Sequence, residues 1–209
     1  MSITPPPYFS QFASPELVNS FLAEPSSTLS DPRWAESGWL TREEYAFWAW
    51  QTCGVACLQS LLTAQTTTTP TAAALTKDLL ENGAYRLDQA LGTTTGLIYE
   101  PFATYVWARW RVSAQVRGRL PVEDLKRELL PTGRVAIASV HPSIRQLSGT
   151  PRSTLKTSGG HLVLAFGTDS EGISFHNPSG YWPDTQAMVK LPWEQFALVY
   201  ARRAILIQL

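Results

Sequence analysis

Cys53 is the residue whose type and position point most directly to chemistry. It opens the segment Cys53-Gly-Val-Ala-Cys-Leu-Gln-Ser-Leu-Leu-Thr63, whose apolar residues recur at helical spacing, so the thiol is expected at the first turn of a buried helix. Free N–H groups and the positive end of the helix dipole favour a thiolate there, and the thiolate is the nucleophilic form. Cys53 is therefore predicted to be a nucleophile. The alternative is the common one for a free cysteine, a small buried core residue.

Cys57 lies one turn further along the same helix and is expected in the core. Two cysteines four residues apart on one helix need a strained bridge to join them, so both are predicted to be free thiols. They also lack a histidine at ligand spacing, so they cannot complete a tetrahedral metal site. Neither a metal nor a cofactor is predicted.

His161 is the best candidate for the base that a nucleophilic thiol needs. His161-Leu-Val-Leu-Ala-Phe166 and Gly172-Ile-Ser-Phe-His-Asn177 read as the two strands of a hairpin. If the three residues Thr168-Asp-Ser170 form the loop, His161 and Asn177 become direct cross-strand neighbours. The Asn177 side-chain oxygen would then fix the tautomer of the imidazole.

This register also predicts which residues share the face of His161, and a different loop length would give another register. The three-residue loop places four apolar residues on the face of His161, as a floor that would pack against the Cys53 helix: Val163, Ala165, Ile173 and Phe175. A four-residue loop would instead move Asn177 to the opposite face and bring His176 onto the face of His161.

Each of these residues also has an ordinary structural explanation. His161 could be a histidine at a strand start that bonds a loop carbonyl, and Asn177 could be a turn residue before Pro178. His141 and His176 are expected to be structural or adjacent to the substrate rather than catalytic.

Helical patterns fill the first half of the chain and strand patterns the second. The predicted helices cover residues 15–22, 53–63, 71–82, 101–110 and 121–129, and the predicted strands 111–117, 134–140, 161–166, 172–177 and 198–209. This order indicates an α+β protein with a small antiparallel sheet. Residues 1–44, rich in proline and aromatic side chains, are predicted to form an arm wrapped on a domain of residues 45–209.

The composition excludes several classes of partner. The 209 residues contain 17 basic and 17 acidic side chains, so no net field attracts nucleic acid or an acidic membrane surface. No apolar run approaches the length of a membrane helix, and the first residues carry no signal-peptide pattern. A cytoplasmic protein without membrane or nucleic-acid partners is predicted, and its oligomeric state is not indicated.

The segment 141–160 is long for a plain connection and borders His161. It contains Arg145, Arg152 and Lys156 and no acidic residue, so it reads either as a lid that binds an anionic substrate group or as a solvated loop. Arg145 and Arg152 are accordingly predicted substrate contacts, as are Gly160 beside His161 and Trp50 ahead of the Cys53 helix.

Three motifs together carry a family resemblance. Gln51-Thr-Cys-Gly-Val-Ala-Cys-Leu58, Gly159-Gly-His-Leu-Val-Leu164 and His176-Asn-Pro178 resemble the bacteriocin-processing cysteine peptidases, family thirty-nine of the papain-like group, in their stand-alone peptidase-like branch. The resemblance covers roughly residues 45–205. It implies a papain-like α+β fold in which Cys53 is the nucleophile, His161 the base and Asn177 the residue that orients the base, as in Cys-His-Asn sites. It also implies cleavage of peptide bonds, classically after a pair of glycines.

One position departs from this family. The glutamine that usually stabilises the oxyanion six residues before the nucleophile is replaced by Phe47. Gln51, two residues before Cys53, is the nearest glutamine and is predicted to take this role, unless it is only a solvated loop residue. The indole N–H of Trp48 or Trp50 is an alternative donor.

The sequence therefore predicts a cysteine hydrolase that cleaves a peptide or other amide bond through an acyl-enzyme. An acyltransferase or peptide cyclase of a biosynthetic pathway would use the same acyl-enzyme and is the first alternative. A catalytically silent peptide-binding domain is the second. The expected substrate is a peptide or a small amide.

Overall fold

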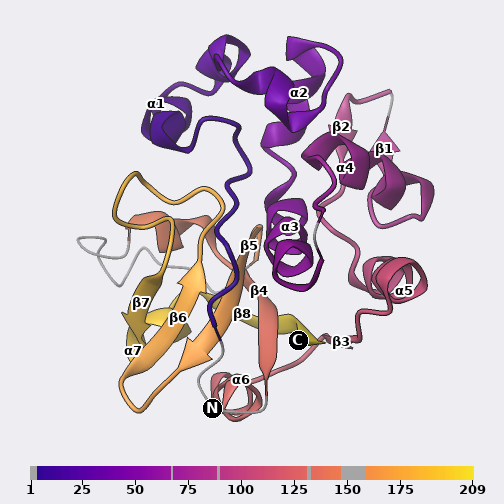
Figure 1. Ribbon diagram of the computed structural model, residues 1–209. Helices are drawn as coiled ribbons and strands as arrows, with labels where there is room; N and C mark the ends of the chain where they lie inside the picture. The colour runs from indigo at the N-terminus through magenta and orange to yellow at the C-terminus, as the bar shows by residue number, and fades with distance from the viewer. Residues whose placement is uncertain (1–3, 67, 89, 131–132, 147–158) are drawn as a thin grey trace.

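A group of helices packs against one face of an antiparallel sheet in the computed structural model (Figure 1). The structure describes residues 4–66, 68–88, 90–130, 133–146 and 159–209. The helical part contains the elements η1 (Pro15–Leu17), α1 (Val18–Ala23), η2 (Pro25–Ser30), η3 (Trp34–Ser37), α2 (Arg42–Ala49), α3 (Cys53–Gln65), α4 (Ala72–Glu81) and α5 (Tyr99–Trp110), with a small hairpin of β1 (Leu87–Asp88) and β2 (Thr93–Thr94).

The sheet has six antiparallel strands in the order β3-β8-β4-β5-β6-β7. Its strands are β3 (Ala114–Arg117), β4 (Arg134–Val140), β5 (His161–Thr168), β6 (Gly172–His176), β7 (Val189–Pro192) and β8 (Tyr200–Gln208), and the remaining elements are α6 (Val122–Leu129), η4 (Pro142–Gln146) and α7 (Trp193–Ala197). The α+β prediction is confirmed. The sequence analysis predicted no helix or strand at the positions of α2, β7 and α7. The predicted domain boundary at residue 44 falls inside α2.

Local signals account for several element ends. The hydroxyl of Thr41 accepts from the N–H of Glu44 at the start of α2, and the hydroxyl of Thr71 accepts from Ala74 at the start of α4. Arg111 ends α5 in the left-handed region, with φ of 58°. For that reason β3 begins at Ala114 and not at residue 111 as predicted.

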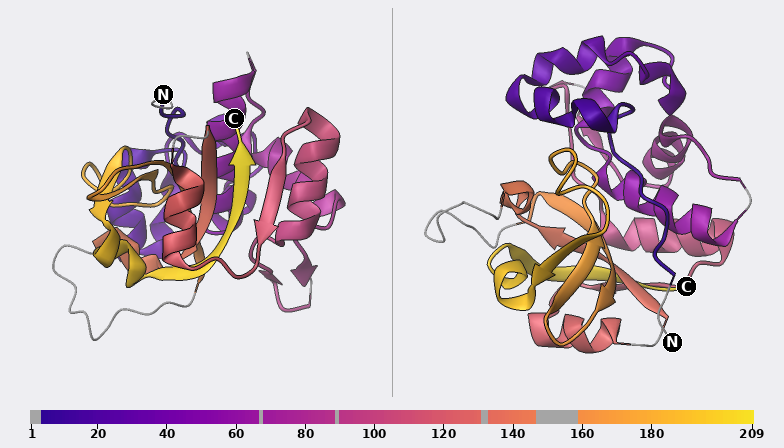
Figure 2. Two further views of the ribbon diagram at one scale, coloured as in Figure 1. Left: turned by 90° about the horizontal axis from the view of Figure 1, so that it is seen from below. Right: turned by 60° about the vertical axis from the view of Figure 1, so that its left-hand side comes forward.

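The sheet lies between two groups of helices, as the views of Figure 2 show. An apolar core fills the space on each of its faces. On one face, Leu162 and Leu164 of β5 pack against the α3 side, where Val55 and Leu58 are buried. The opposite face packs against α6 and α7. It buries the residues that were predicted to face the Cys53 helix, namely Val163, Ala165, Ile173 and Phe175. That prediction is wrong, because the even-numbered side chains of β5 face α3.

The hairpin of β5 and β6 also differs from the predicted one. Thr168 pairs with Ile173, so four residues, 169–172, connect the last pair of the hairpin. The side chain of Asp169 accepts from the N–H groups of Glu171 and Gly172 at 2.9 Å each. A bulge between Ala165 and Gly167 then shifts the register by one residue. The bulge restores the original parity. His161 and Asn177 are therefore not cross-strand partners, although they remain close.

Residues 4–14 run between the sheet and the helices before the chain enters α1, as the dark blue trace in Figure 1 shows. The main-chain N–H of Gln11 donates to the carbonyl of Pro178 at 2.9 Å, and its side chain donates to the carbonyl of Ala49 at 2.7 Å. The carbonyl of Pro6 accepts from His176 Nε2 at 2.7 Å. This segment thus joins the end of α2 to the loop after β6.

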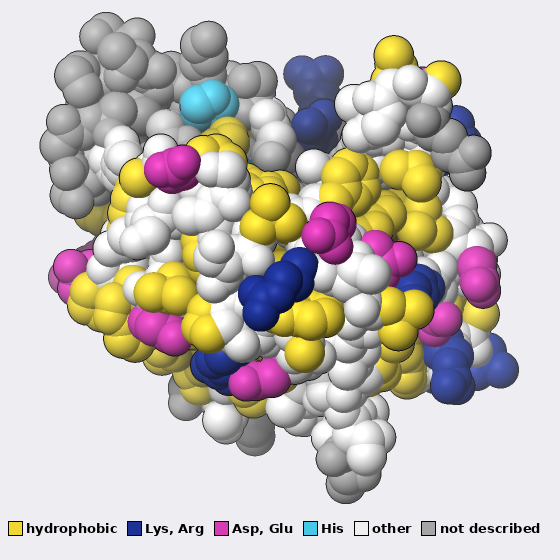
Figure 3. All heavy atoms as spheres, turned by 90° about the horizontal axis from the view of Figure 1, so that it is seen from above, with side chains coloured by type: hydrophobic (Ala, Val, Ile, Leu, Met, Phe, Trp, Pro, Cys, Tyr) yellow, Lys and Arg dark blue, Asp and Glu magenta, His cyan; other side chains and the backbone are white. Residues whose placement is uncertain are grey.

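The surface seen from above Figure 1 mixes both signs of charge with apolar side chains (Figure 3). Basic and acidic side chains lie close together on this face, so it presents no large field of one sign. Among the described residues, no helix is both long and apolar enough to cross a membrane.

Candidate active site

Cys53 is the first residue of α3, as predicted, and its side chain is half-buried. Gly54 behind it sits in a tight space, because an added Cβ would lie 2.8 Å from Leu97 Cδ2 and 3.1 Å from Leu162 Cδ1. The absence of a side chain at position 54 therefore lets the start of α3 approach β5 closely. Cys57, by contrast, is 1% exposed and belongs to the core.

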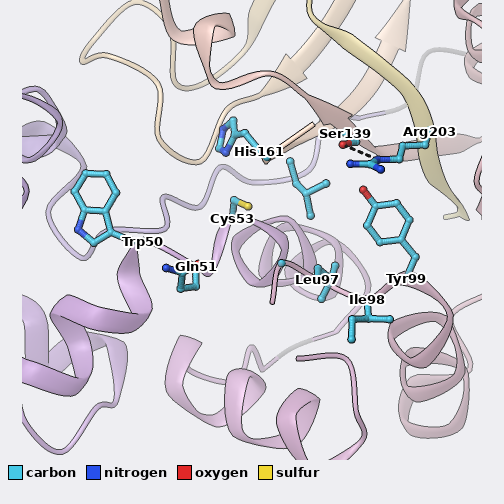
Figure 4. A pocket seen from close by; sticks show the side chains of 12 residues that line it. Trp50, Gln51, Cys53, Leu97, Ile98, Tyr99, Ser139, His161 and Arg203 are labelled. Atoms are coloured by element: carbon cyan, nitrogen blue, oxygen red, sulfur yellow. Dashed lines mark hydrogen bonds between the residues drawn. The ribbon is translucent and has the colours of Figure 1, made fainter. Parts of the chain in front are cut away.

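His161 is the first residue of β5 and is 3% exposed. Gly160 before it has φ of 136°, a conformation that other residues rarely adopt. This turn brings the imidazole to the end of the sheet, where α3 begins. Figure 4 shows the His161 ring and the Cys53 side chain facing the same cavity.

Asn177 follows β6 and contacts the imidazole directly. Its Oδ1 lies 2.7 Å from His161 Nε2. Since an amide oxygen only accepts, Nε2 carries the proton in this contact, and Nδ1 of the neutral ring is left as the basic nitrogen. Asn177 is fully buried, and its Nδ2 has no hydrogen-bond partner within the part of the chain that the structure describes.

The main chain around Asn177 is held from two sides. Its N–H donates to the carbonyl of Gln186 at 2.7 Å, and the hydroxyl of Tyr8 donates to its carbonyl at 3.4 Å. The N–H of Ser179 donates to the same Oδ1 that contacts His161, at 3.3 Å. The Ser179 N–H fixes the orientation of the side-chain amide, whereas the other two bonds hold only the main chain.

Arg145 lies behind this group and is bonded to Ser179. Its Nε donates to the Ser179 carbonyl at 2.9 Å, and its Nη2 donates to the Ser179 hydroxyl at 2.6 Å. That hydroxyl oxygen is 3.5 Å from His161 Nε2. Arg145 thus places a positive charge close to the imidazole, with its Nε and Nη2 donating to Ser179.

Burial dominates the electrostatics of both reactive groups. It lowers the pKa of His161 to about 3, with the charge of Arg145 acting in the same direction and the bond to Asn177 opposing it. Burial also raises the pKa of the Cys53 thiol, against the N–H of Leu162, the N–H of Gly54 and the charge of Arg145. The expected depression of the Cys53 pKa by its helix position is therefore wrong. Both shifts favour the uncharged forms, the thiol and the neutral imidazole.

A cavity of about 460 Å³ lies over Cys53 and His161. Its walls come from the start of α3, the start of β5, the segment before α5, and the facing ends of β4 and β8 (Figure 4). The lining residues include Trp50, Gln51, Gly160, Leu97, Ile98 and Leu162, with a polar group of Tyr99, Ser139 and Arg203.

The three candidates for the oxyanion donor, Gln51, Trp48 and Trp50, are placed differently. Gln51 lines the cavity next to Cys53, whereas the indole N–H of Trp50 donates to the hydroxyl of Thr28 at 3.2 Å. Trp48 is 6% exposed and stacks on Trp39, with ring centroids 5.7 Å apart. Phe47 packs edge-on against Trp48. Trp50 also lines the cavity, but its N–H is bonded to Thr28, so Gln51 is the best placed of the three donors.

The structure brings most of the predicted site residues to one place. Cys53, His161, Gln51, Trp50 and Gly160 line the cavity, and Asn177 supports His161 from behind. Arg145 is bonded to Ser179 rather than lining the cavity. Arg152 and the rest of the predicted lid over 147–158 lie outside the described residues.

Four polar residues near the site were not anticipated: Ser179, Tyr99, Ser139 and Arg203. A signal existed for two of them. Ser139 and Arg203 interrupt apolar rows of β4 and β8, where Ile137 and Ile205 are the buried neighbours of the same parity. A polar residue at such an inward position is typical of a site.

His176 is structural. Its Nδ1 accepts from the N–H of Met188 at 3.1 Å, so its Nε2 carries the proton that it donates to Pro6. Tyr8 and Phe166 pack against its ring.

Comparison with known proteins is informative at the level of the fold. No protein-family model matches the chain, and no curated protein matches it. Among solved structures, a crystal structure from Bacillus anthracis provisionally described as a C39-like peptidase is similar, with a TM-score of 0.50 and 15% sequence identity, over 75% of this chain and 88% of that one. The chain therefore adopts a C39-like peptidase fold, of the papain-like α+β type that the sequence predicts.

Proposed function

We propose that this protein is a cysteine hydrolase that cleaves a peptide or other amide bond through an acyl-enzyme on Cys53. The observation that carries the proposal is the 2.7 Å contact of His161 Nε2 with Asn177 Oδ1, together with a half-buried thiol at a helix start that lines the same cavity as His161. The peptidase fold of the similar structure supports the same reaction class.

The preference for the uncharged forms defines the role of His161. Since burial disfavours both the thiolate and the imidazolium, His161 Nδ1 takes the thiol proton as the sulfur attacks the carbonyl carbon. The same nitrogen then gives this proton to the leaving amine as the carbon–nitrogen bond breaks. Water attacks the thioester in the second half, with His161 again as the base, and releases the acid and the free thiol.

Asn177 and Arg145 act on His161 in opposite directions. The Asn177 oxygen stabilises the imidazolium that forms during attack, whereas Arg145 disfavours it. Arg145 favours the thiolate, however, because its charge lowers the pKa of Cys53. The N–H of Cys53, which has no acceptor within its own helix, and the side chain of Gln51 are the proposed donors to the oxyanion.

An acylation assay tests the proposal without knowledge of the natural substrate. Wild-type protein mixed with p-nitrophenyl acetate is expected to release a burst of about one p-nitrophenol per chain, and peptide mass mapping should find the acetyl group on Cys53. Cys53→Ala should show no burst, and His161→Ala a burst slowed by orders of magnitude. The acetyl group on Cys57, or no acyl group on either thiol, would contradict the proposal.

A second assay separates hydrolysis from acyl transfer and from silent binding. A synthetic peptide library incubated with wild-type protein should yield new free carboxyl ends, which Cys53→Ala does not produce. Added glycine amide would capture the acyl group in place of water if the protein is a transferase. Binding without new ends or new amide products would indicate the silent peptide-binding domain.

A further inference from the structure

Arg203 and Ser139 stand opposite each other at the cavity end of β8 and β4. Both lie on the side of the sheet that faces α3 and α5, in line with the buried Ile205 and Ile137. The register of β4 and β8 shifts between Ala138 and Val140, so several residues of β8 oppose Ser139. This bulge turns Arg203 towards the cavity at the point where the apolar rows end.

The two residues and Tyr99 form one polar group. Arg203 Nε donates to Ser139 Oγ at 3.3 Å, and Ser139 is 1% exposed. The Tyr99 hydroxyl points at the same pair (Figure 4). Burial raises the pKa of Tyr99, while the Ser139 hydroxyl and the charge of Arg203 lower it. One edge of the guanidinium is thus fixed to the protein, which sets the direction of the other nitrogens.

Arg203 has no carboxylate partner among the described residues, and its side chain is exposed. Within the described part of the chain, it is also the one Lys, Arg, Asp or Glu side chain that lines the cavity. The neighbouring segment 141–160 contains no acidic residue in its sequence. A fixed guanidinium in a cavity whose described lining residues include no carboxylate has the form of an anion subsite.

The floor between this group and Cys53 is apolar. Leu97 and Ile98 lie along it in Figure 4, and Leu162 borders the thiol. A ligand that spans the cavity would therefore place an apolar portion on these side chains, one end at Cys53 and an anionic end at Arg203. A planar carboxylate matches the remaining donors of the guanidinium and the Tyr99 hydroxyl.

We propose that Tyr99, Ser139 and Arg203 form a subsite that binds a carboxylate of the peptide substrate, supplied by its free C-terminus or by an acidic side chain. This inference rests on the proposed function, because it treats the cavity as the place where Cys53 meets its substrate. The proposed substrates of Cys53 are therefore peptides that carry a carboxylate.

Matched reactive probes test the subsite. Iodoacetyl-glutamate amide and iodoacetyl-glutamine amide differ only in the side-chain charge, and iodoacetyl-glycylglycine as acid and as amide differ only at the C-terminus. The acidic member of at least one pair should alkylate Cys53 about tenfold faster than its neutral partner, as expected for one charge-assisted hydrogen bond. The pair that shows the preference identifies the source of the carboxylate.

Variants locate the cation responsible. Arg203→Gln should abolish the preference, and Arg203→Lys should retain part of it. Arg202→Gln removes the same charge from the exposed neighbour that does not line the cavity, and it should keep the full preference. Equal rates within both pairs in the wild type, a preference that survives Arg203→Gln, or one that Arg202→Gln abolishes equally would overturn the subsite.

An equilibrium measurement keeps the two proposals separable. Acetylated pentapeptides in the same acid and amide pairs can be titrated calorimetrically into Cys53→Ala, which needs no reactive thiol. Tighter binding of the acid, lost in Arg203→Gln, would support the subsite even if Cys53 proved unreactive and the hydrolase proposal failed. Reactive Cys53 without acid preference in either method would instead overturn the subsite alone.

Discussion

Replacing Asn177 by alanine tests the centre of the proposed site. Asn177 Oδ1 lies 2.7 Å from His161 Nε2 and also accepts from the N–H of Ser179 at 3.3 Å. The substitution removes the acceptor of the Nε2 proton and leaves the Ser179 hydroxyl oxygen, at 3.5 Å, as a weaker partner. Because Nδ2 of Asn177, which has no partner among the described residues, disappears with the side chain, we expect the fold to survive.

The expected loss of rate follows from the charge that the imidazole gains. A hydrogen bond to a charged group contributes about 1.5–3 kcal/mol. If the imidazolium exists only during attack, this contribution is absent from the ground state and is lost from the transition state. A change of about 1.4 kcal/mol is a tenfold change in rate. Asn177→Ala should therefore lower kcat about 10-fold to 100-fold with little change in KM.

The assay compares three variants in the steady state with a peptide taken from the library cleavage. His161→Ala should be slower than Asn177→Ala by about a further order of magnitude, since it removes the base itself. Tyr8→Phe removes only the hydroxyl that donates to the Asn177 carbonyl, so it controls for disturbance of the loop and should retain its activity. Full activity in Asn177→Ala, or a loss confined to KM, would refute the orienting role.

Four further predictions concern the two thiols, the base and the nearby charge. At pH 6 iodoacetamide should modify Cys53 at least about tenfold faster than Cys57, whose pKa burial raises further and which is 1% exposed; equal rates by mass mapping would favour the silent-domain alternative. Cys53→Ala should abolish turnover and leave the free energy of unfolding within about 1 kcal/mol, whereas Cys57→Ser should lose about 1–3 kcal/mol by burying a hydroxyl, as denaturant titration can measure. Burial lowers the pKa of His161 from 6.5 to about 3, so the unfolded chain binds this proton at a higher pH than the folded chain. The free energy of unfolding, and with it Tm, should therefore fall as the pH is lowered from about 6.5 towards 3. His161→Gln should make Tm fall less steeply over this pH range, and an unchanged slope would contradict the burial of His161. Arg145→Gln should move the pH midpoint of Cys53 alkylation upwards, because the charge of Arg145 lowers the Cys53 pKa, and a downward shift would exclude that role.

Features encoded locally were predictable from the sequence. The helical spacing of apolar residues after Cys53 placed the thiol at the first residue of α3. Asn82-Gly83 ended α4 near the expected position, with Gly83 at φ of 76°. The long apolar strands β4 and β5 also lay close to the predicted ranges. In each case neighbours within a few residues determine the backbone.

The short elements after Asn177 were not predictable in the same way. β7 has four residues with alternating partial exposure, and α7 has five, so neither presents enough repeats for a periodicity to appear. Both acquire their form from the edge strand and the core that they cover. Pro192 at their junction fits the end of an edge strand.

The pairing of His161 with Asn177 shows how a correct contact can follow from an incorrect register. The sequence indicated a hairpin but gave no sign of the bulge between Ala165 and Gly167, and the loop has four residues. The longer loop and the bulge each shift the register, and together they leave the odd-numbered side chains of the two strands on a common face, as the sequence predicted. Asn177 then reaches His161 from the turn after β6. Only the pairing with the neighbouring strands determines where such a bulge forms.

The sequence by itself determined where the candidate reactive groups lie along the chain, because residue type and position in a helix or strand are local properties. They are a thiol at the start of α3, an imidazole at the start of β5, and an amide after β6. The tertiary structure decided their protonation and their surroundings. Burial outweighs the helix dipole at Cys53 and neutralises His161. The tertiary structure also brings Arg203 to Ser139 at the cavity and Arg145 to Ser179, and each of these pairs is separated by at least 34 positions in the sequence. Desolvation and long-range packing depend on the whole fold, so no local pattern of residues encodes them.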